Sequence, residues 1–306
     1  MQIYLLSPSG AVRDKQALRR AVRALGSMGH QVTLDPSALS SVQRFAGDDD
    51  TRLQAIQRAA HSGADLVMLT RGGYGLTRLL KRLPYKAVAA SIRRGTRWMG
   101  HSDFTALQTA LLAKTGQVTW AGPHACADFG NPEVDEVMQA CFEDCVSGRA
   151  EGVGWRLPAR DLTALPRRAL LAQDAVLWGG NLSVLCSMIG TPYMPHIEGG
   201  VLFLEDVAEH PYRIERMLTQ CLQAGILAQQ QAIVLGQFTD YRLTSHDKGF
   251  NLASVVDWVR SQVKVPVLTS LPFGHVPTKV CLPVGQRVSL IREGREAFLL
   301  WAHEPH

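Results

Sequence analysis

Residues 64–75 read ADLVMLTRGGYG, in which the mostly apolar run Ala64–Thr70 ends abruptly at Arg71-Gly72-Gly73-Tyr74-Gly75. A short apolar run without strict alternation predicts a strand buried on both faces, as in parallel sheets. The glycines that follow predict a sharp turn at the carboxyl end of that strand. This segment therefore predicts an α/β fold.

The same pattern repeats on both sides of this segment. Short apolar runs alternate with stretches whose apolar residues recur at helical spacing, and Asp48–Asp50 supplies an acidic N-cap for one of them. We expect strands at residues 3–6, 32–34, 64–70 and 98–100. We expect helices at residues 15–28, 52–60, 87–92 and 104–113, and a further helix that follows the glycine turn and runs through residue 80. This alternation predicts a parallel sheet covered by helices on both faces.

The length of 306 residues predicts two domains, because single hydrophobic cores rarely grow beyond about 250–300 residues. We expect an N-terminal domain over residues 1–150, a glycine- and proline-containing linker over 151–169, and a C-terminal domain over 170–306. In the C-terminal domain we expect strands at 201–204, 232–235 and 265–269, helices at 182–188, 211–224 and 252–263, and a β-rich tail over 280–301.

Composition excludes several classes of protein. The net charge is +5, and the arginine pairs are scattered rather than arranged in a basic stripe, so we expect no nucleic-acid partner. No apolar run approaches the roughly 20 residues that cross a bilayer, and Met1–Ser7 lacks the basic start of a signal peptide, so we expect a cytoplasmic protein without membrane contact. The six cysteines show neither the spacing of a zinc site nor a disulfide framework, which predicts free thiols. We expect no metal and no cofactor.

Ligands of open α/β sheets bind beyond the carboxyl ends of the strands, and that rule selects the turn at residues 71–75 first. Its glycines would let backbone amides approach an anion or an oxyanion closely. The turn lacks both the GxGxxG pattern and the Lys-Ser/Thr of a phosphate loop. A plain strand-to-helix turn, with Arg71 on the surface, is the alternative.

A second candidate is Gly100-His101-Ser102-Asp103-Phe104, between an expected strand and an expected helix. A serine there can expose its hydroxyl at the top of the sheet, as in a nucleophile elbow, although the usual final glycine is missing. Helix capping by Ser102 is the alternative.

Carboxylates and a histidine provide the third candidate. An apolar run ends at Glu205-Asp206, and His275 follows the expected strand 265–269 in a Pro- and Gly-containing loop. Glu205 could orient a histidine or act as an acid or base itself. The alternatives are that the carboxylates are solvated and that the histidine lies on the surface. A glycosidase that uses Glu205 and Asp206 as its catalytic pair is disfavoured, because adjacent strand residues point to opposite faces of the sheet.

Together these segments resemble the serine LD-carboxypeptidase family, also called muramoyltetrapeptide carboxypeptidases. The resemblance follows the order of motifs along nearly the whole chain: Ser7-Pro-Ser-Gly10, Arg44-Phe-Ala-Gly47, Arg71-Gly-Gly-Tyr-Gly75, Gly100-His-Ser-Asp-Phe-Thr-Ala106, Trp178-Gly-Gly-Asn181, Gly190-Thr-Pro192, Leu204-Glu-Asp206, Arg213-Ile-Glu-Arg216 and Phe273-Gly-His275. It implies Ser102 as nucleophile, Glu205 as acid and His275 as base.

The resemblance also implies a fold and a substrate. The fold would be a Rossmann-like parallel α/β domain followed by a domain with a β-barrel-like sheet, with the active site in the cleft between them. The protein would be a homodimer that removes the terminal D-Ala from murein tetrapeptide stems during cell-wall recycling. The residues after His275, Val276-Pro-Thr-Lys279, depart from the family modestly.

We expect backbone N–H groups of Gly73 and Asp103 to hold the oxyanion. Arg71 is the candidate for gripping the D-Ala carboxylate, and Tyr74 and Asn181 are further candidates for substrate binding. Asn181 is alternatively the N-cap of the helix at 182–188.

Two other functions remain open at this point. One is a relative of the same fold that confers immunity by cleaving a peptide–nucleotide antibiotic with the same triad. The other is a non-catalytic α/β module, with Ser102 as a helix cap and the glycine turn gripping a phosphate.

Overall fold

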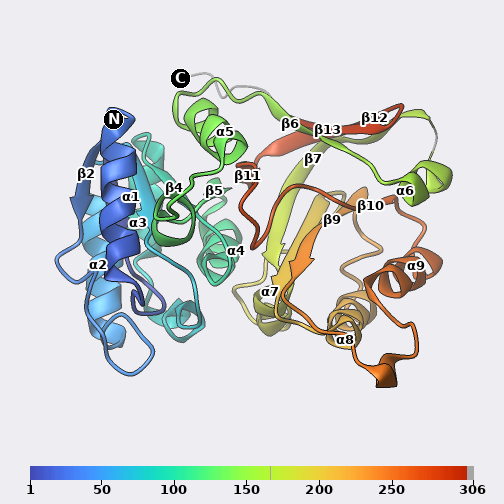
Figure 1. Ribbon diagram of the computed structural model, residues 1–306, viewed down its shortest axis with the longest axis horizontal. Helices are drawn as coiled ribbons and strands as arrows, with labels where there is room; N and C mark the ends of the chain where they lie inside the picture. Colours follow the sequence, from blue (N-terminus) through green and yellow to red (C-terminus); the bar gives the residue numbers. More distant parts are fainter. Residues whose placement is uncertain (166, 302–306) are drawn as a thin grey trace. The chain divides into compact units, whose positions relative to one another are not determined.

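The computed structural model describes residues 1–165 and 167–301 (Figure 1). The chain divides into two compact units, and each is built from separate segments of the sequence. Unit 1 comprises Met1–Arg149, Pro192–Pro195 and Pro277–Gly285, and unit 2 comprises Ala150–Thr191, His196–Val276 and the chain from Gln286 onward. The predicted linker contains an edge strand, β6 (Gly152–Arg156), and a short helix, α6 (Ala159–Ala164), although its Pro166 lies outside the described residues. Residues 302–306 of the predicted C-terminal domain also lie outside them.

Unit 1 contains the parallel sheet that the sequence predicts. Its strand order is β11-β5-β4-β3-β1-β2, and the pairs from β2 to β5 are parallel, whereas β11 joins β5 antiparallel. The bounds are β1 (Gln2–Leu6), β2 (Gln31–Leu34), β3 (Leu66–Leu69), β4 (Arg97–Gly100), β5 (Thr119–Ala121) and β11 (Leu282–Val284). β3 is buried throughout because the sheet is covered on both faces.

Helices cover both faces of this sheet. The chain runs from β1 outward to β2 and then back across to β3, so α1 lies on one face and the later crossover helices lie on the other. Accordingly α2 packs on α3 and α3 on α4, while α1 packs on the π-helical turn η3 (Ala125–Phe129). The bounds are α1 (Lys15–Ser27), α2 (Asp49–His61), α3 (Tyr85–Arg93), α4 (Phe104–Thr115) and α5 (Glu136–Val146). Asp48 caps α2 by accepting from the Thr51 amide at 2.8 Å.

Unit 2 is built on a mixed sheet of strand order β10-β9-β8-β7-β12-β13-β6. The pairs from β10 to β7 are parallel and the others antiparallel. Trp155 of β6 donates from Nε1 to Thr269 O, directly after β10, at 3.0 Å, so a side-chain contact links the two outermost strands of this order. Among the described residues no strand pairing joins β6 to β10, so the sheet-rich domain is confirmed without a closed barrel. The bounds are β7 (Arg168–Asn181), β8 (Val201–Val207), β9 (Ala232–Thr239), β10 (Val267–Leu268), β12 (Arg287–Glu293) and β13 (Glu296–Leu300).

The three helices predicted for the C-terminal domain are present with nearly the expected bounds, as α7 (Leu182–Met188), α8 (Pro211–Gln223) and α9 (Leu252–Gln262). Unit 2 also contains α6, which falls where the sequence predicted a linker. Across the described residues, none of the helices combines the length and the apolar character needed to cross a membrane. The predicted two-domain α/β fold class is confirmed.

Candidate active site

Three loops of unit 1 meet at the carboxyl edge of its sheet. They follow β1, β3 and β4, which are neighbours in the strand order and run parallel. The first loop contacts the second because Gly10 N donates to Gly72 O at 3.3 Å. Two of the segments selected from the sequence, the glycine turn and the Ser102 turn, therefore lie at the same edge.

Gly72 lies directly against Ser102. A Cβ added to Gly72 would lie 2.8 Å from the Ser102 Cβ and 2.9 Å from its Oγ, closer than non-bonded carbon atoms approach. Glycine is required at this position because only a hydrogen fits between the two loops. The glycine turn thus does more than reverse the chain: it brings backbone amides next to the serine.

Ser102 adopts a strained backbone conformation. Its φ is 60°, in the left-handed region that a non-glycine residue occupies rarely and that clusters at functional sites. β4 ends at Gly100 and α4 begins at Phe104, so the serine lies on a sharp strand-to-helix turn. The interpretation of Ser102 as the helix N-cap is wrong, because that position belongs to Asp103. The geometry is that of a nucleophile elbow.

Asp103 and Arg52 brace the glycine turn. The Asp103 carboxylate is buried and accepts from the Leu76 amide at 2.8 Å, and its burial raises the pKa of Asp103. Arg52 of α2 is also buried, and its Nη1 donates to Pro8 O at 3.2 Å and to Gly75 O at 2.9 Å. These contacts tie the loops after β1, β3 and β4 together. No local sequence pattern indicates either role, because both depend on long-range contacts.

Two buried histidines contact the backbone that leads into the serine turn. His124 Nε2 accepts from the His101 amide at 3.1 Å, and the two imidazoles stack with centroids 3.8 Å apart. His101 Nδ1 bonds to Gly122 O at 2.8 Å. The backbone immediately before Ser102 is therefore fixed by side-chain contacts. His101 lies in a segment selected from the sequence, but local sequence does not reveal this structural role for either histidine.

The predicted oxyanion-hole residues, Gly73 and Asp103, flank the serine turn. Gly73 has a φ of 94°, which again favours glycine. Within residues 1–165 and 167–301, neither the Gly73 amide nor the Asp103 amide donates a hydrogen bond to another protein atom. Both N–H groups are therefore available to an incoming acceptor.

Unit 2 joins Glu205 and His275. Glu205, on β8, is fully buried, and its Oε2 lies 2.8 Å from His275 Nδ1. His275 follows Gly274, whose φ of 141° and whose closeness to Gln237 O, 2.9 Å from an added Cβ, require glycine. A carboxylate that accepts from Nδ1 fixes the imidazole orientation and tautomer. Glu205 and His275 thus occur as a bonded pair.

Asn181 bonds the second carboxylate oxygen of Glu205 and also bonds Asp206. Asn181 Nδ2 donates to Glu205 Oε1 at 3.2 Å and to Asp206 Oδ1 at 2.9 Å. The expectation that Glu205 and Asp206 point to opposite faces is wrong, because a register shift in β8 between Leu204 and Asp206 lets both reach the same amide. Asn181 Oδ1 also accepts from the Val184 amide at 3.1 Å, which confirms it as the N-cap of α7.

Of the other candidates, Arg71 is half-buried, and its Nη1 donates to Ala11 O at 3.1 Å. Tyr74 is exposed, with the Arg44 guanidinium 5.8 Å from its ring centroid. Unit 1 thus holds Ser102, Asp103, Gly73, Arg71 and Tyr74, and unit 2 holds Glu205, His275 and Asn181. The described residues contain no group of three or more His, Cys, Asp or Glu that could hold a metal ion.

Comparison with known proteins identifies the family. Residues 3–122 match the LD-carboxypeptidase N-terminal domain and residues 174–290 match the LD-carboxypeptidase C-terminal domain. A putative carboxypeptidase of Synechocystis is 30% identical over 94% of this chain and 91% of the relative. The murein tetrapeptide carboxypeptidase of Pseudomonas aeruginosa is 28% identical over 94% of this chain and 92% of its own length.

Solved structures agree with this assignment. The muramoyltetrapeptide carboxypeptidase of Oxalobacter formigenes superimposes with a TM-score of 0.87 at 36% identity, covering 100% of both chains. A more distant relative is the microcin C7 self-immunity protein MccF of Escherichia coli, 25% identical over 73% of this chain and 70% of the relative. The domain matches, the 30% identity and the full-length superposition together show that this chain belongs to the LD-carboxypeptidase family.

Proposed function

We propose that this protein is a serine-type carboxypeptidase that removes the terminal D-Ala from murein tetrapeptide stems. The observation that carries the proposal is the left-handed backbone of Ser102, which lies on a strand-to-helix turn pressed against Gly72. Strain of this kind is maintained where it exposes a nucleophile. The murein peptide carboxypeptidases among its relatives support the substrate class.

In the proposed mechanism, Ser102 acts with the Glu205–His275 pair. Because Glu205 accepts from Nδ1, the basic atom of the imidazole is Nε2, which takes the Ser102 proton as Oγ attacks the scissile carbonyl. The buried Glu205 carboxylate stabilises the imidazolium that forms. His275 then gives the proton to the amine of the leaving D-Ala, and water hydrolyses the ester by the same route.

The Gly73 and Asp103 amides would stabilise the tetrahedral intermediate. Both lack a protein acceptor among the described residues, so neither must break a bond to receive the oxyanion. Preorganised donors of this kind each lower a barrier by about 2.7–4 kcal/mol. Asp103 has a double role, because its carboxylate also fixes the Leu76 end of the turn that carries Gly73.

Arg71, Tyr74 and Asn181 remain proposed contacts for the peptide. Arg71 supplies a cation beside the glycine turn. Asn181 already bonds Glu205, Asp206 and the Val184 amide, which is enough to explain its presence. The cytoplasmic recycling role and the homodimer stay predictions.

The test is D-Ala release from L-Ala-γ-D-Glu-meso-diaminopimelate-D-Ala, with EDTA in every reaction. Wild type is compared with Ser102→Ala and with Ser187→Ala, whose exposed hydroxyl donates to Val184 O in its own helix. We expect release by wild type and Ser187→Ala, and none by Ser102→Ala. Release by Ser102→Ala would exclude this serine as the nucleophile.

The same assay separates the alternative activity. If folded wild type releases no D-Ala but cleaves an aminoacyl sulfamoyl adenosine, the substrate class belongs with that of MccF, which has been solved with aspartyl sulfamoyl adenosine. The higher identity to the muramoyltetrapeptide carboxypeptidase, 36% against 21%, favours the murein substrate.

A further inference from the structure

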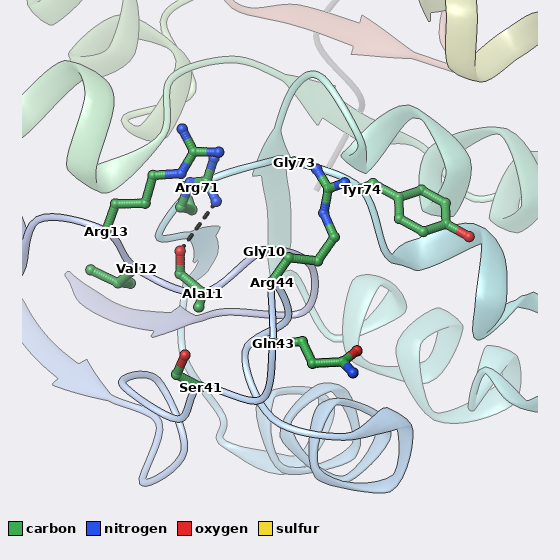
Figure 2. Close-up of a pocket in the computed structure, with 10 residues that line it drawn as sticks. All are labelled: Gly10, Ala11, Val12, Arg13, Ser41, Gln43, Arg44, Arg71, Gly73 and Tyr74. Atoms are coloured by element: carbon green, nitrogen blue, oxygen red, sulfur yellow. Dashed lines mark hydrogen bonds between the residues drawn. The ribbon is translucent and has the colours of Figure 1, made fainter.

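A small cationic pocket lies beside the serine turn, within unit 1. Its volume is about 260 Å³, and it is lined by Gly10–Arg13, by Arg44 and by Arg71, Gly73 and Tyr74 (Figure 2). These residues belong to the loops that follow β1, β2 and β3. The volume is slightly below the roughly 300–1,000 Å³ typical of pockets for drug-sized ligands, so it suits one small group.

The position of the pocket follows from the strand order. The chain leaves β1 toward β2 on one side and later returns to β3 on the other, so the loops diverge between β1 and β3. In doubly wound sheets with this order the ligand crevice opens at that topological switch point. Gly10 and Arg71 come from the two loops that border it.

Three arginines give the pocket its charge. In the part of the chain that the structure describes, no Asp or Glu forms an ion pair with Arg13, Arg44 or Arg71, and Asp14 pairs with Arg20 at 3.3 Å instead. Burial, and then the positive charges of Arg13 and Arg44, lower the pKa of Arg71. Uncompensated like charges around one cavity favour an anionic ligand.

Arg71 is the fixed member of the three. Its Nη1 donates to Ala11 O, and its guanidinium lies between two glycines, since a Cβ on Gly10 would collide with Nη1 and one on Gly73 would lie 3.3 Å from it. Figure 2 shows the Arg13 side chain beside Arg71, and Arg44 reaching toward Gly73 and Tyr74. Arg13 and Arg44 are exposed and can adjust to a ligand.

We propose that this pocket binds the free carboxylate of the leaving residue, with Arg13 and Arg44 closing on an anion seated against Arg71. The assignment rests on the proposed function. Gly73 lines the pocket and is also the proposed oxyanion donor. The pocket is therefore adjacent to the position that the scissile carbonyl would occupy. Only the carboxylate of the leaving residue lies within a few bonds of that carbonyl, which makes the pocket the feature that restricts cleavage to chain ends.

The test compares two substrates that differ only at the chain end: the tetrapeptide with a free D-Ala carboxylate and the same peptide ending in D-alaninamide. The kcat/KM of each is measured for wild type, Arg13→Gln, Arg44→Gln and Arg71→Gln. Arg93→Gln, at the exposed end of α3, is the matched control. Because the bonds are charge-assisted, wild type should prefer the free acid by roughly 10- to 100-fold.

Each pocket variant should lower this preference at least several-fold by reducing kcat/KM for the acid alone, and Arg93→Gln should match wild type. Equal losses for acid and amide, or an unchanged preference, would overturn the pocket assignment while leaving the carboxypeptidase activity intact. Failure of wild type to release D-Ala from the free acid would overturn both.

Discussion

Asp206 should make the stability of this protein fall as the pH rises. The side chain is 3% exposed and bonds Asn181, next to the fully buried Glu205. Burial, with the neighbouring Glu205 charge adding to it, raises the pKa of Asp206 from 3.8 to about 6. Because the folded pKa is the higher one, the folded state binds more protons between these values. The stabilisation that Asp206 contributes is therefore complete below pH 3.8 and lost as the pH rises through 6.

The size of the effect follows from the same two values. The gap between 3.8 and about 6, at about 1.4 kcal/mol for each pH unit, gives about 3 kcal/mol in all. About 2 kcal/mol of this should be lost between roughly pH 4.5 and pH 7.5. Asn cannot titrate, so the unfolding free energy of wild type minus that of Asp206→Asn should fall by that amount over this range.

Urea unfolding of both proteins at the two pH values measures this difference. Asp144→Asn, which removes an exposed carboxylate paired with Arg149 at 3.1 Å, serves as the control for the chemical change alone. A wild-type advantage over Asp206→Asn that stays constant or grows with pH would refute the reasoning, because it would mean that Asp206 is ionised in the folded state throughout.

Two further changes test the site directly. Gly72→Ala should lower kcat about 100-fold or more, because the new Cβ would lie 2.8 Å from Ser102 Cβ and must displace the nucleophile. Gly26→Ala in α1, where nothing lies within 4 Å of the added Cβ, should be fully active. Equal activity of the two variants would contradict the close packing of Gly72 on Ser102. Glu205→Gln should lower kcat roughly 10³- to 10⁴-fold at nearly constant KM, because an amide can present its N–H to His275 Nδ1 and select the wrong tautomer. A kcat within tenfold of wild type, measured by steady-state kinetics, would remove Glu205 from the triad.

Local patterns predict most of the fold. The buried run that becomes β3, the capping Asp48 and the helix at 182–188 each depend on neighbours in sequence, so their signals are readable without the structure. β6 was missed because two of its five residues are glycine and its pairing with β13 is a long-range contact.

In the candidate site too, some residues are predicted by local sequence patterns and others depend on long-range contacts. Ser102, Glu205 and His275 each follow or end an expected strand, which selects them as candidates, and only their resemblance to a family joins them into one set of roles. The sequence does not reveal the residues that hold the loops of the site in place. Arg52 bonds Gly75, which is 23 positions away in the chain, and Asp103 bonds Leu76, which is 27 positions away. Arg13 and Arg44 likewise join Arg71 only because three loops converge.

The interleaving of the two units has a consequence for synthesis on the ribosome. Unit 1 contains Pro277–Gly285, and β11 within that segment pairs with β5 at the edge of the first sheet. A nascent chain must therefore complete nearly all of unit 2 before the first sheet can receive its last strand. Until then β5 presents an unpaired edge, which is the kind of edge on which chains aggregate. Translation that stalls between residues 149 and 277 should leave a product that depends on chaperones, and neither unit can be obtained whole by a single truncation of the gene.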